Sequence, residues 1–105
     1  MEKIEALAAL SALGQETRLD VFRLLVVAGE QGMLAGQISD ALDLRANTLS
    51  ANLTILLNAG LIRNKREGRA IRYFSNMDGM RDLLQFLTED CCGGNPTACL
   101  PNIRN

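Results

Sequence analysis

The chain has 105 residues, of which 48% are apolar and 22% charged, with a net charge of −1 and no histidine. This length predicts one domain with its own hydrophobic core, and the composition is ordinary for a globular protein. No apolar run reaches the roughly 18–20 residues that a membrane-spanning helix needs, and the N-terminus lacks a secretory pattern. We therefore expect a cytoplasmic protein without a membrane segment.

The first part of the chain predicts helices. Residues 3–13 are rich in alanine and leucine and contain no breaker, which favours a helix. Apolar side chains lie nearly all round it, so we expect burial on two sides, and in so small a domain a partner chain can supply one of them. The helix that follows Gly14 carries Leu19, Phe22 and Val26 on one face, with Leu25 beside them.

A short helix is expected next, within residues 35–44, and it ends in a turn at Asp43 and Leu44. The helix expected over about residues 46–59 has two different faces. Its apolar stripe consists of Leu49, Leu53, Leu56 and Leu57, and its opposite face of Asn47, Ser50, Ala51, Thr54 and Asn58. A merely solvated face usually carries Glu and Lys, whereas short uncharged polar groups can enter a groove of DNA and bond base edges. A plain polar surface helix is the alternative.

In the segment "LIRNKREGRAIRYFS" the character of the side chains alternates along the chain on both sides of Glu67 and Gly68, which predicts a β-hairpin. Residues 45–72 hold six basic groups and only one acid, Glu67, whereas the rest of the chain holds five basic and eleven acidic groups. A basic stripe on an acidic protein marks where a polyanion docks. A solvated charged face is the alternative reading.

A short helix, a tight turn, a longer polar-faced helix and a basic hairpin together predict a winged helix-turn-helix, a mainly α fold with a β-hairpin wing. The longer helix would enter the major groove, and the wing would neutralise phosphates. Half-sites are usually read by a symmetric dimer, so we expect a homodimer built on the first and last helices and an operator that is an imperfect inverted repeat. The predicted DNA contacts are Arg45, Asn47, Thr48, Ser50, Ala51, Asn52, Thr54, Lys65, Arg66, Arg69 and Arg72.

The last predicted helix, with Met80, Leu83, Leu84 and Leu87 at helical spacing, runs into a tail that holds all three cysteines. We therefore expect a DNA-binding and dimerisation domain over residues 1–90 and a cysteine-containing tail over 91–105. An odd number of thiols in a reducing compartment argues against a disulfide framework. Three interpretations of the tail remain: a soft metal or metalloid site, a thiol-redox switch, and an inert segment.

The tail thiols are Cys91, Cys92 and Cys99, and three thiolates without imidazole suit a soft ion. Trivalent arsenic prefers three sulfurs, so this set would saturate it. Zn²⁺ wants a fourth ligand, which Glu89, Asp90 or water can supply.

Several motifs resemble those of the ArsR/SmtB family of bacterial metal- and metalloid-sensing repressors. They are "LGQETRLDVFRLL" (13–25), "ISDALDLRANTLSANLTILLNAGLI" (38–62) and "REGRAIRY" (66–73), in the family's order and spacing. The resemblance covers about residues 5–90 and implies a winged-helix homodimer that represses a resistance operon and leaves DNA when an inducer binds.

The tail sequence "CCGGNPTAC" is similar to the Cys-Cys-Gly-Gly-x-Pro-x-x-Cys motif of an arsenic-responsive subgroup. The resemblance implies that Cys91, Cys92 and Cys99 bind As(III), or the similar Sb(III), as inducer. Two departures matter: residues 33–39 lack the cysteine pair of many arsenic-responsive members, and a zinc site of the family's histidine-containing type is not expected. Arg45 also replaces the usual Ser or Pro and cannot cap the helix, so it would reach a phosphate, or Asn47 would cap a later start.

An enzyme is not expected, because the chain has no Gly-rich phosphate loop, histidine base or paired-carboxylate cleft. The nearer alternatives share the predicted fold. They are a repressor that senses thiol oxidation and a repressor for Cd(II), Pb(II) or Zn(II).

Overall fold

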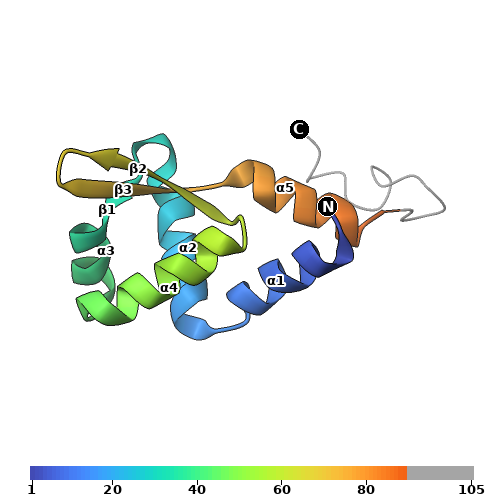
Figure 1. Cartoon of the computed structure of the whole chain (residues 1–105), viewed down its shortest axis with the longest axis horizontal. Helices are drawn as coiled ribbons and strands as arrows, with labels where there is room; N and C mark the ends of the chain where they lie inside the picture. The colour runs from blue at the N-terminus through green and yellow to red at the C-terminus, as the bar shows by residue number, and fades with distance from the viewer. Residues whose placement is uncertain (90–105) are drawn as a thin grey trace.

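The structure is a computed structural model that describes residues 1–89, which form helices and a small antiparallel sheet (Figure 1). The helices and the hairpin expected from the sequence are all present. Within the described residues, no helix is long and apolar enough to cross a membrane. In chain order the elements are α1 (Lys3–Leu13), α2 (Glu16–Ala28), the 3-10 turn η1 (Gly29–Gln31), β1 (Met33–Leu34), α3 (Ala35–Leu42), α4 (Ala46–Asn58), β2 (Ile62–Glu67), β3 (Ala70–Ser75) and α5 (Met77–Leu87).

The sheet has the order β1-β3-β2, with every pair antiparallel. Strands β2 and β3 form the expected hairpin, from the pair Ile62↔Ser75 to the pair Glu67↔Ala70. The loop begins at Gly68, whose φ of 63° is a conformation that glycine adopts at no steric cost. Strand β1 was not predicted. It has only two residues, too few for a period-2 pattern, and it is fixed by pairing with β3 far along the chain.

The hydrophobic core lies where α2, α3 and α4 meet β3 and the start of β2. The predicted stripe of α4 is confirmed, since Leu49, Leu53 and Leu56 are buried and Leu57 is half-buried. The turn predicted after α3 is confirmed at Asp43, which has a left-handed φ of 53°. The remaining large buried side chains are Val21, Phe22, Leu25, Ile38, Leu61, Ile62, Tyr73 and Leu83.

Helix α1 packs against the rest of the domain through three alanines and through Leu13 at its carboxyl end. Ala6, Ala9 and Ala12 are buried and let the helix lie close to α2 and α4. Burial on two sides was expected, with a partner chain able to supply one of them, and within the described residues the chain itself covers the face that holds the three alanines and Leu13. Ile4, Leu7 and Leu10 point outward instead, and Ile4 and Leu7 are 77% and 58% exposed.

The buried face of α2 differs from the expected one. Phe22 and Leu25 are buried, but Leu19 and Val26 are 41% and 40% exposed, and Val21 takes the inward position instead. The reason is that almost every residue from 19 to 28 is apolar, so periodicity alone does not fix the inward face.

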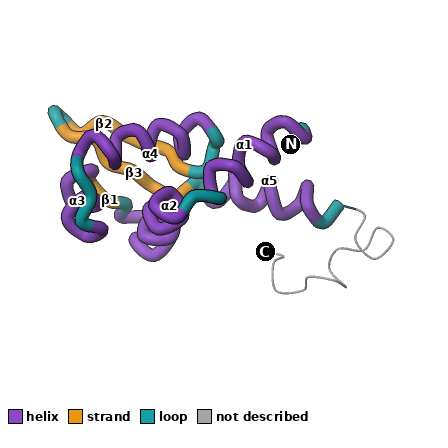
Figure 2. The backbone as a smooth tube through the Cα atoms, turned by 90° about the horizontal axis from the view of Figure 1, so that it is seen from below, coloured by secondary structure: helices purple, strands orange, loops and turns teal. Residues whose placement is uncertain are grey.

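Helix α5 is tied to the end of α4. Asn76, at the N-cap of α5, donates from Nδ2 to the carbonyl of Gly60 at 2.9 Å. A Cβ at Gly79 would collide with the same carbonyl, so only glycine allows this approach. Helices α1 and α5 contact each other at the end of the molecule opposite the hairpin (Figure 2).

Candidate nucleic-acid interface

The outward face of α4 is uncharged, mostly polar and exposed. Asn47, Ser50, Thr54 and Asn58 are exposed, as is the methyl group of Ala51 between them. The buried leucine stripe on the opposite side fixes which way this face points, because rotation of the helix would expose that stripe. The Thr54 hydroxyl donates to the Ser50 carbonyl at 3.0 Å, so the oxygen keeps its acceptor capacity toward solvent.

The amino end of α4 points outward together with Arg45. The helix begins at Ala46 with Arg45 at the N-cap, and within the described part of the chain the Arg45 side chain makes no capping hydrogen bond. Asn47 Oδ1 accepts from the Thr48 amide at 2.9 Å, so an asparagine inside the first turn partly replaces a cap. Free first-turn N–H groups with an arginine beside them suit a phosphate oxygen.

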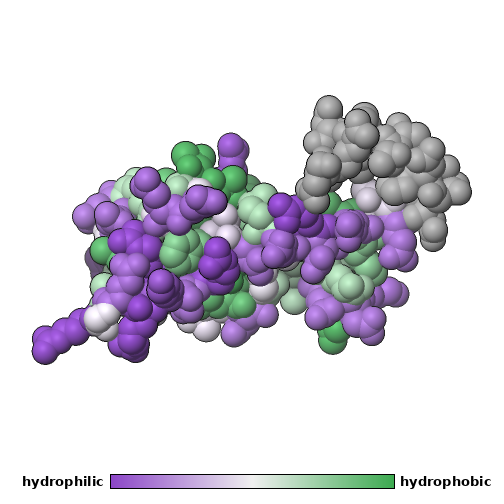
Figure 3. Space-filling model, turned by 90° about the horizontal axis from the view of Figure 1, so that it is seen from above, coloured by the Kyte–Doolittle hydropathy of each residue, from purple (hydrophilic) through white to green (hydrophobic). Residues whose placement is uncertain are grey.

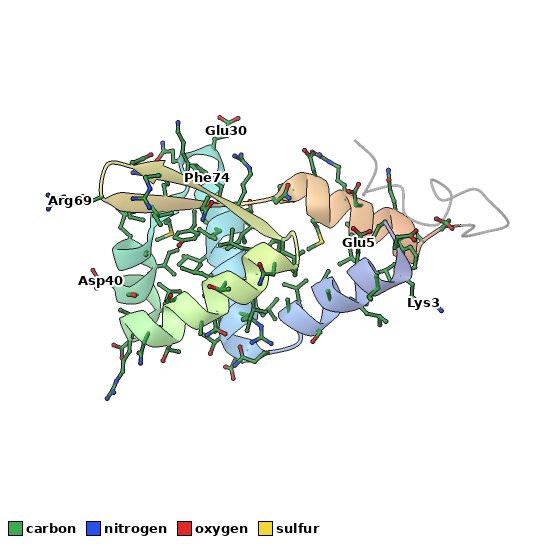
Figure 4. The ribbon with its side chains drawn as sticks, in the orientation of Figure 1. Lys3, Glu5, Glu30, Asp40, Arg69 and Phe74 are labelled. Atoms are coloured by element: carbon green, nitrogen blue, oxygen red, sulfur yellow. The ribbon has the colours of Figure 1, made fainter. Side chains whose placement is uncertain are left out.

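The hairpin carries its charges on an exposed strand. From Arg63 to Glu67 every residue of β2 is exposed. Figure 4 shows Arg69 at the hairpin tip, with its side chain pointing away from the body of the protein. In Figure 3 the end of the molecule that bears the hairpin is mostly hydrophilic. A flexible, solvated row of cations suits the phosphate backbone, whose recognition needs charge more than shape.

Arg72 is a hairpin cation with hydrogen-bond partners inside the protein. Its Nε donates to Glu67 Oε2 at 2.9 Å, and another guanidinium nitrogen donates to the Gln31 carbonyl at 3.1 Å. The ion pair is partly exposed and contributes only about 0–1 kcal/mol. It offsets the repulsion between Arg72 and Lys65, which face each other in the register. Arg72 therefore holds the wing against η1.

Asn52 is likewise engaged inside the protein. Its Oδ1 accepts from an Arg18 guanidinium nitrogen at 3.3 Å, and its Nδ2 donates to the Thr48 carbonyl at 3.0 Å. Asn52 and Arg72 are the two half-buried members of the predicted DNA-contact set. The exposed members are Arg45, Asn47, Thr48, Ser50, Ala51, Thr54, Lys65, Arg66 and Arg69.

Arg63 belongs to the same surface but was not among the predicted contacts. Its guanidinium carbon lies 4.9 Å from the centroid of the Phe74 ring, a cation–π arrangement between residues that pair across the hairpin. A signal existed in the sequence, because Arg63 is two residues from Lys65 on the same strand and so lies on the same face. The ring holds its charge in place beside Lys65.

The three cysteines predicted to bind the inducer, Cys91, Cys92 and Cys99, lie outside the described residues. Within residues 1–89 no group of three or more His, Cys, Asp or Glu side chains is placed to hold a metal ion.

Comparisons with known proteins agree on the class of the chain. A helix-turn-helix domain family matches residues 13–64. An uncharacterised HTH-type transcriptional regulator of Methanocaldococcus jannaschii is 32% identical over 90 residues, which are 85% of this chain and 99% of that protein. A Halobacterium salinarum protein, provisionally named as the arsenical resistance operon repressor ArsR, is 36% identical over 70 residues. That match covers 67% of this chain but only 54% of the relative.

A solved structure is similar over most of the described fold. It is the homodimeric winged helix-turn-helix DNA-binding domain of a possible ArsR-family transcriptional regulator from Mycobacterium bovis. The TM-score is 0.65 at 28% identity, covering 80% of this chain and 76% of that one.

Proposed function

The chain belongs to the ArsR family of winged helix-turn-helix transcriptional regulators, and from this premise we propose that it is an arsenic-responsive repressor. It binds operator DNA as a homodimer and leaves the operator when As(III), or Sb(III), binds three cysteine thiolates. Family membership makes it a transcriptional regulator and not an enzyme. The observation that carries the DNA-binding part is the exposed, uncharged polar face of α4 beside a basic hairpin.

Each part of that surface has its own task in the proposed complex. Helix α4 lies in the major groove, where Asn47 and Ser50 bond base edges. Lys65, Arg66 and Arg69 contact phosphates, which gives affinity and salt dependence without sequence information. The lower exposure of Asn52 and Arg72 supports tasks inside the protein for these two.

The proposed dimer uses the end of the molecule opposite the hairpin. There Ile4, Leu7 and Leu10 of α1 are 77%, 58% and 42% exposed, and Leu87 of α5 is 51% exposed. Large aliphatic side chains gathered on two neighbouring helices favour an apolar partner. A second copy offers the same surface, and two-fold pairing would place two α4 helices at half-sites of an inverted repeat.

The inducer part of the proposal rests on the chemistry of the tail sequence. Cys91, Cys92 and Cys99 supply three soft ligands, which is the number that As(III) bonds. The name of the haloarchaeal relative supports the same assignment. Release requires that the ion bind more tightly to the dimer state that does not fit the operator, because a ligand shifts an equilibrium only through such a difference.

Two alternatives keep the same fold and change only the signal. Adjacent thiols can also respond to oxidation, and soft divalent ions such as Cd(II) or Pb(II) also prefer thiolates, as Zn(II) does with a fourth ligand. Release by peroxide but not by arsenite would favour the first alternative. Release by one of these divalent ions at lower concentration than arsenite would favour the second.

Base reading by α4 is tested by comparing two kinds of substitution. Asn47→Ala or Ser50→Ala is expected to weaken binding to the operator by about 1–3 kcal/mol and to leave nonspecific binding nearly unchanged. Arg69→Ala is expected to weaken both and to lower the slope of log affinity against log salt by about one. Fluorescence anisotropy at several salt concentrations measures all of these. Equal losses on operator and scrambled DNA for Asn47→Ala and Ser50→Ala would remove their role as base readers.

A further inference from the structure

Arg18 joins three helices through one guanidinium group. Its Nε donates to the Ala12 carbonyl at 2.7 Å, and one terminal nitrogen donates to the Ser11 carbonyl at 3.4 Å, so it binds the last turn of α1. The other terminal nitrogen donates to Asn52 Oδ1 at 3.3 Å, on α4. Arg18 itself lies in α2, and burial of the core face of α2 fixes the direction in which the Arg18 side chain leaves the helix. Helices α1, α2 and α4 therefore share one polar joint.

The joint depends on the shape of arginine. The last carbonyls of a helix have no partner within the helix, and a cation near them is favoured by the helix dipole. Arginine presents several N–H donors in a rigid plane, so it can bond two carbonyls and a third acceptor at once. A lysine in this place keeps the charge but has a single flexible nitrogen. It can cap α1 or reach Asn52, but it does not hold both in fixed geometry.

Asn52 is oriented to receive this bond. Its Nδ2 donates to the Thr48 carbonyl one turn earlier in α4, which leaves Oδ1 directed to Arg18. Both ends of the amide thus have partners within the protein, and the side chain is half-buried. By contrast Asn47 and Ser50, on the same helix, are exposed. The face of α4 that turns to DNA and the flank that is held by Arg18 are different parts of the helix.

The joint lies between the proposed dimer face and the proposed reading face. The outer side of α1 carries the exposed aliphatic residues that would meet the partner copy, and its last turn is the part that Arg18 binds. Apart from Leu13 at its end, the inner side carries alanines, whose small side chains offer little shape to prevent the helix from sliding or turning. The hydrogen bonds of Arg18 add directional contacts that fix α4 relative to α1.

We infer that Arg18, acting through Asn52, is a positioning residue that sets the placement of the two α4 helices in the dimer and so the half-site spacing that the protein accepts. This inference rests on the proposed function. In it Asn52 is the anchor of α4 and not a reader of bases. The inducer is not involved in this step.

The test uses the full-length protein and the duplex that the wild-type dimer selects from a randomised pool. Affinities for this duplex, for a scrambled one and for versions with one base pair added or removed between half-sites are measured for wild type, Arg18→Lys, Asn52→Ala and the double variant. Arg18→Lys and Asn52→Ala are each expected to weaken binding to the selected duplex about tenfold and to flatten the preference for spacing. The double variant should bind within about twofold of the weaker single variant, because both changes break the same contact.

A loss of affinity of about a hundredfold in the double variant would mean that the two single effects add. This result would overturn the inference and would favour a direct contact between Asn52 and DNA. An unchanged spacing preference would also overturn it, since a merely structural role lowers stability without changing which spacing is preferred. Arg23→Lys, at an exposed site of the same helix, is the matched control and should behave as wild type. Thermal unfolding and sedimentation confirm that the variants compared are folded dimers at the assay concentration.

Asn52→Ala changes a helix surface and keeps the test decisive if Arg18→Lys does not fold. In that case Asn52→Ala by itself must lose the preference for half-site spacing. An Asn52→Ala protein that kept this preference would contradict the inference. A wild-type protein that enriches no sequence from the pool would instead overturn the proposed function, and with it the inference.

Discussion

Replacing Cys91, Cys92 or Cys99 by serine, one at a time, is expected to leave operator binding intact and to remove release by arsenite. A serine hydroxyl is a hard, protonated oxygen at neutral pH and does not replace a thiolate as a ligand for a soft ion. The arsenite concentration for half-release should rise by more than the roughly 10- to 100-fold that loss of an outer-shell partner costs a metal site. An operator gel shift under reducing conditions, with arsenite titrated into the preformed complex, measures this.

The matched control for these variants is Thr97→Ser, a change in the same segment that removes no thiol. It should be released at the wild-type arsenite concentration. If all three cysteine variants were released as readily as wild type, the tail would not be the sensor. If they failed to bind the operator before arsenite was added, the cysteines would have a role in DNA binding that the account does not include.

Placing a charge on the outer face of α1 is expected to break the dimer. Leu7 is 58% exposed in the single chain and lies between Ile4 and Leu10 on the same helix. In a paired α1 surface a glutamate at this position would be buried without a partner, which is strongly unfavourable. Leu7→Glu should therefore shift the protein to monomer. Its operator affinity should fall by about 100-fold or more, because a monomer loses the gain from engaging two linked half-sites.

Sedimentation velocity and operator binding at matched protein concentration test this expectation together. Val27→Glu is the control, since Val27 is 81% exposed and lies in the last turn of α2, at the helix end that leads into η1 and not at the end that follows α1. It places the same charge on an exposed aliphatic site and should stay dimeric. A Leu7→Glu protein that remained dimeric with wild-type operator affinity would place the interface elsewhere.

The elements of the fold were predictable wherever the pattern was local. The leucine stripe of α4 and the alternation of the hairpin each extend over several residues, so their periods stand out. Gly60 follows the last residues of α4, and its φ of 76° is the left-handed conformation that favours glycine after a helix. These features depend on interactions between near neighbours in the sequence.

Features that depend on distant partners were not predictable. Strand β1 exists because β3 offers a free edge about forty residues later. The inward face of α2 was expected at Leu19, Phe22 and Val26, but tertiary packing buries Val21 in place of Leu19 and Val26. No sequence pattern of α2 shows that Arg18 meets Asn52, because their separation in the chain is 34 residues.

Part of the candidate site was also predictable from the sequence, and part of it was not. The exposed polar face of α4 and the basic hairpin followed from the sequence, since residue type and spacing determine them. Which cations are engaged inside the protein did not follow, because Arg72 and Arg69 have the same side chain in the same hairpin. Only the fold brings Gln31 and Glu67 to Arg72 and leaves Arg69 exposed at the tip.

Coupling between arsenic binding and DNA release is measured by titrating arsenite into the reduced wild-type dimer bound to its operator, with bound arsenic and released DNA followed in the same samples. We expect one As(III) to bind per subunit and release to be complete when this ratio is reached. Arsenic bound at this ratio with the operator still occupied would show that the repressor is not arsenic-responsive, as would release by peroxide in protein that arsenite leaves on the DNA.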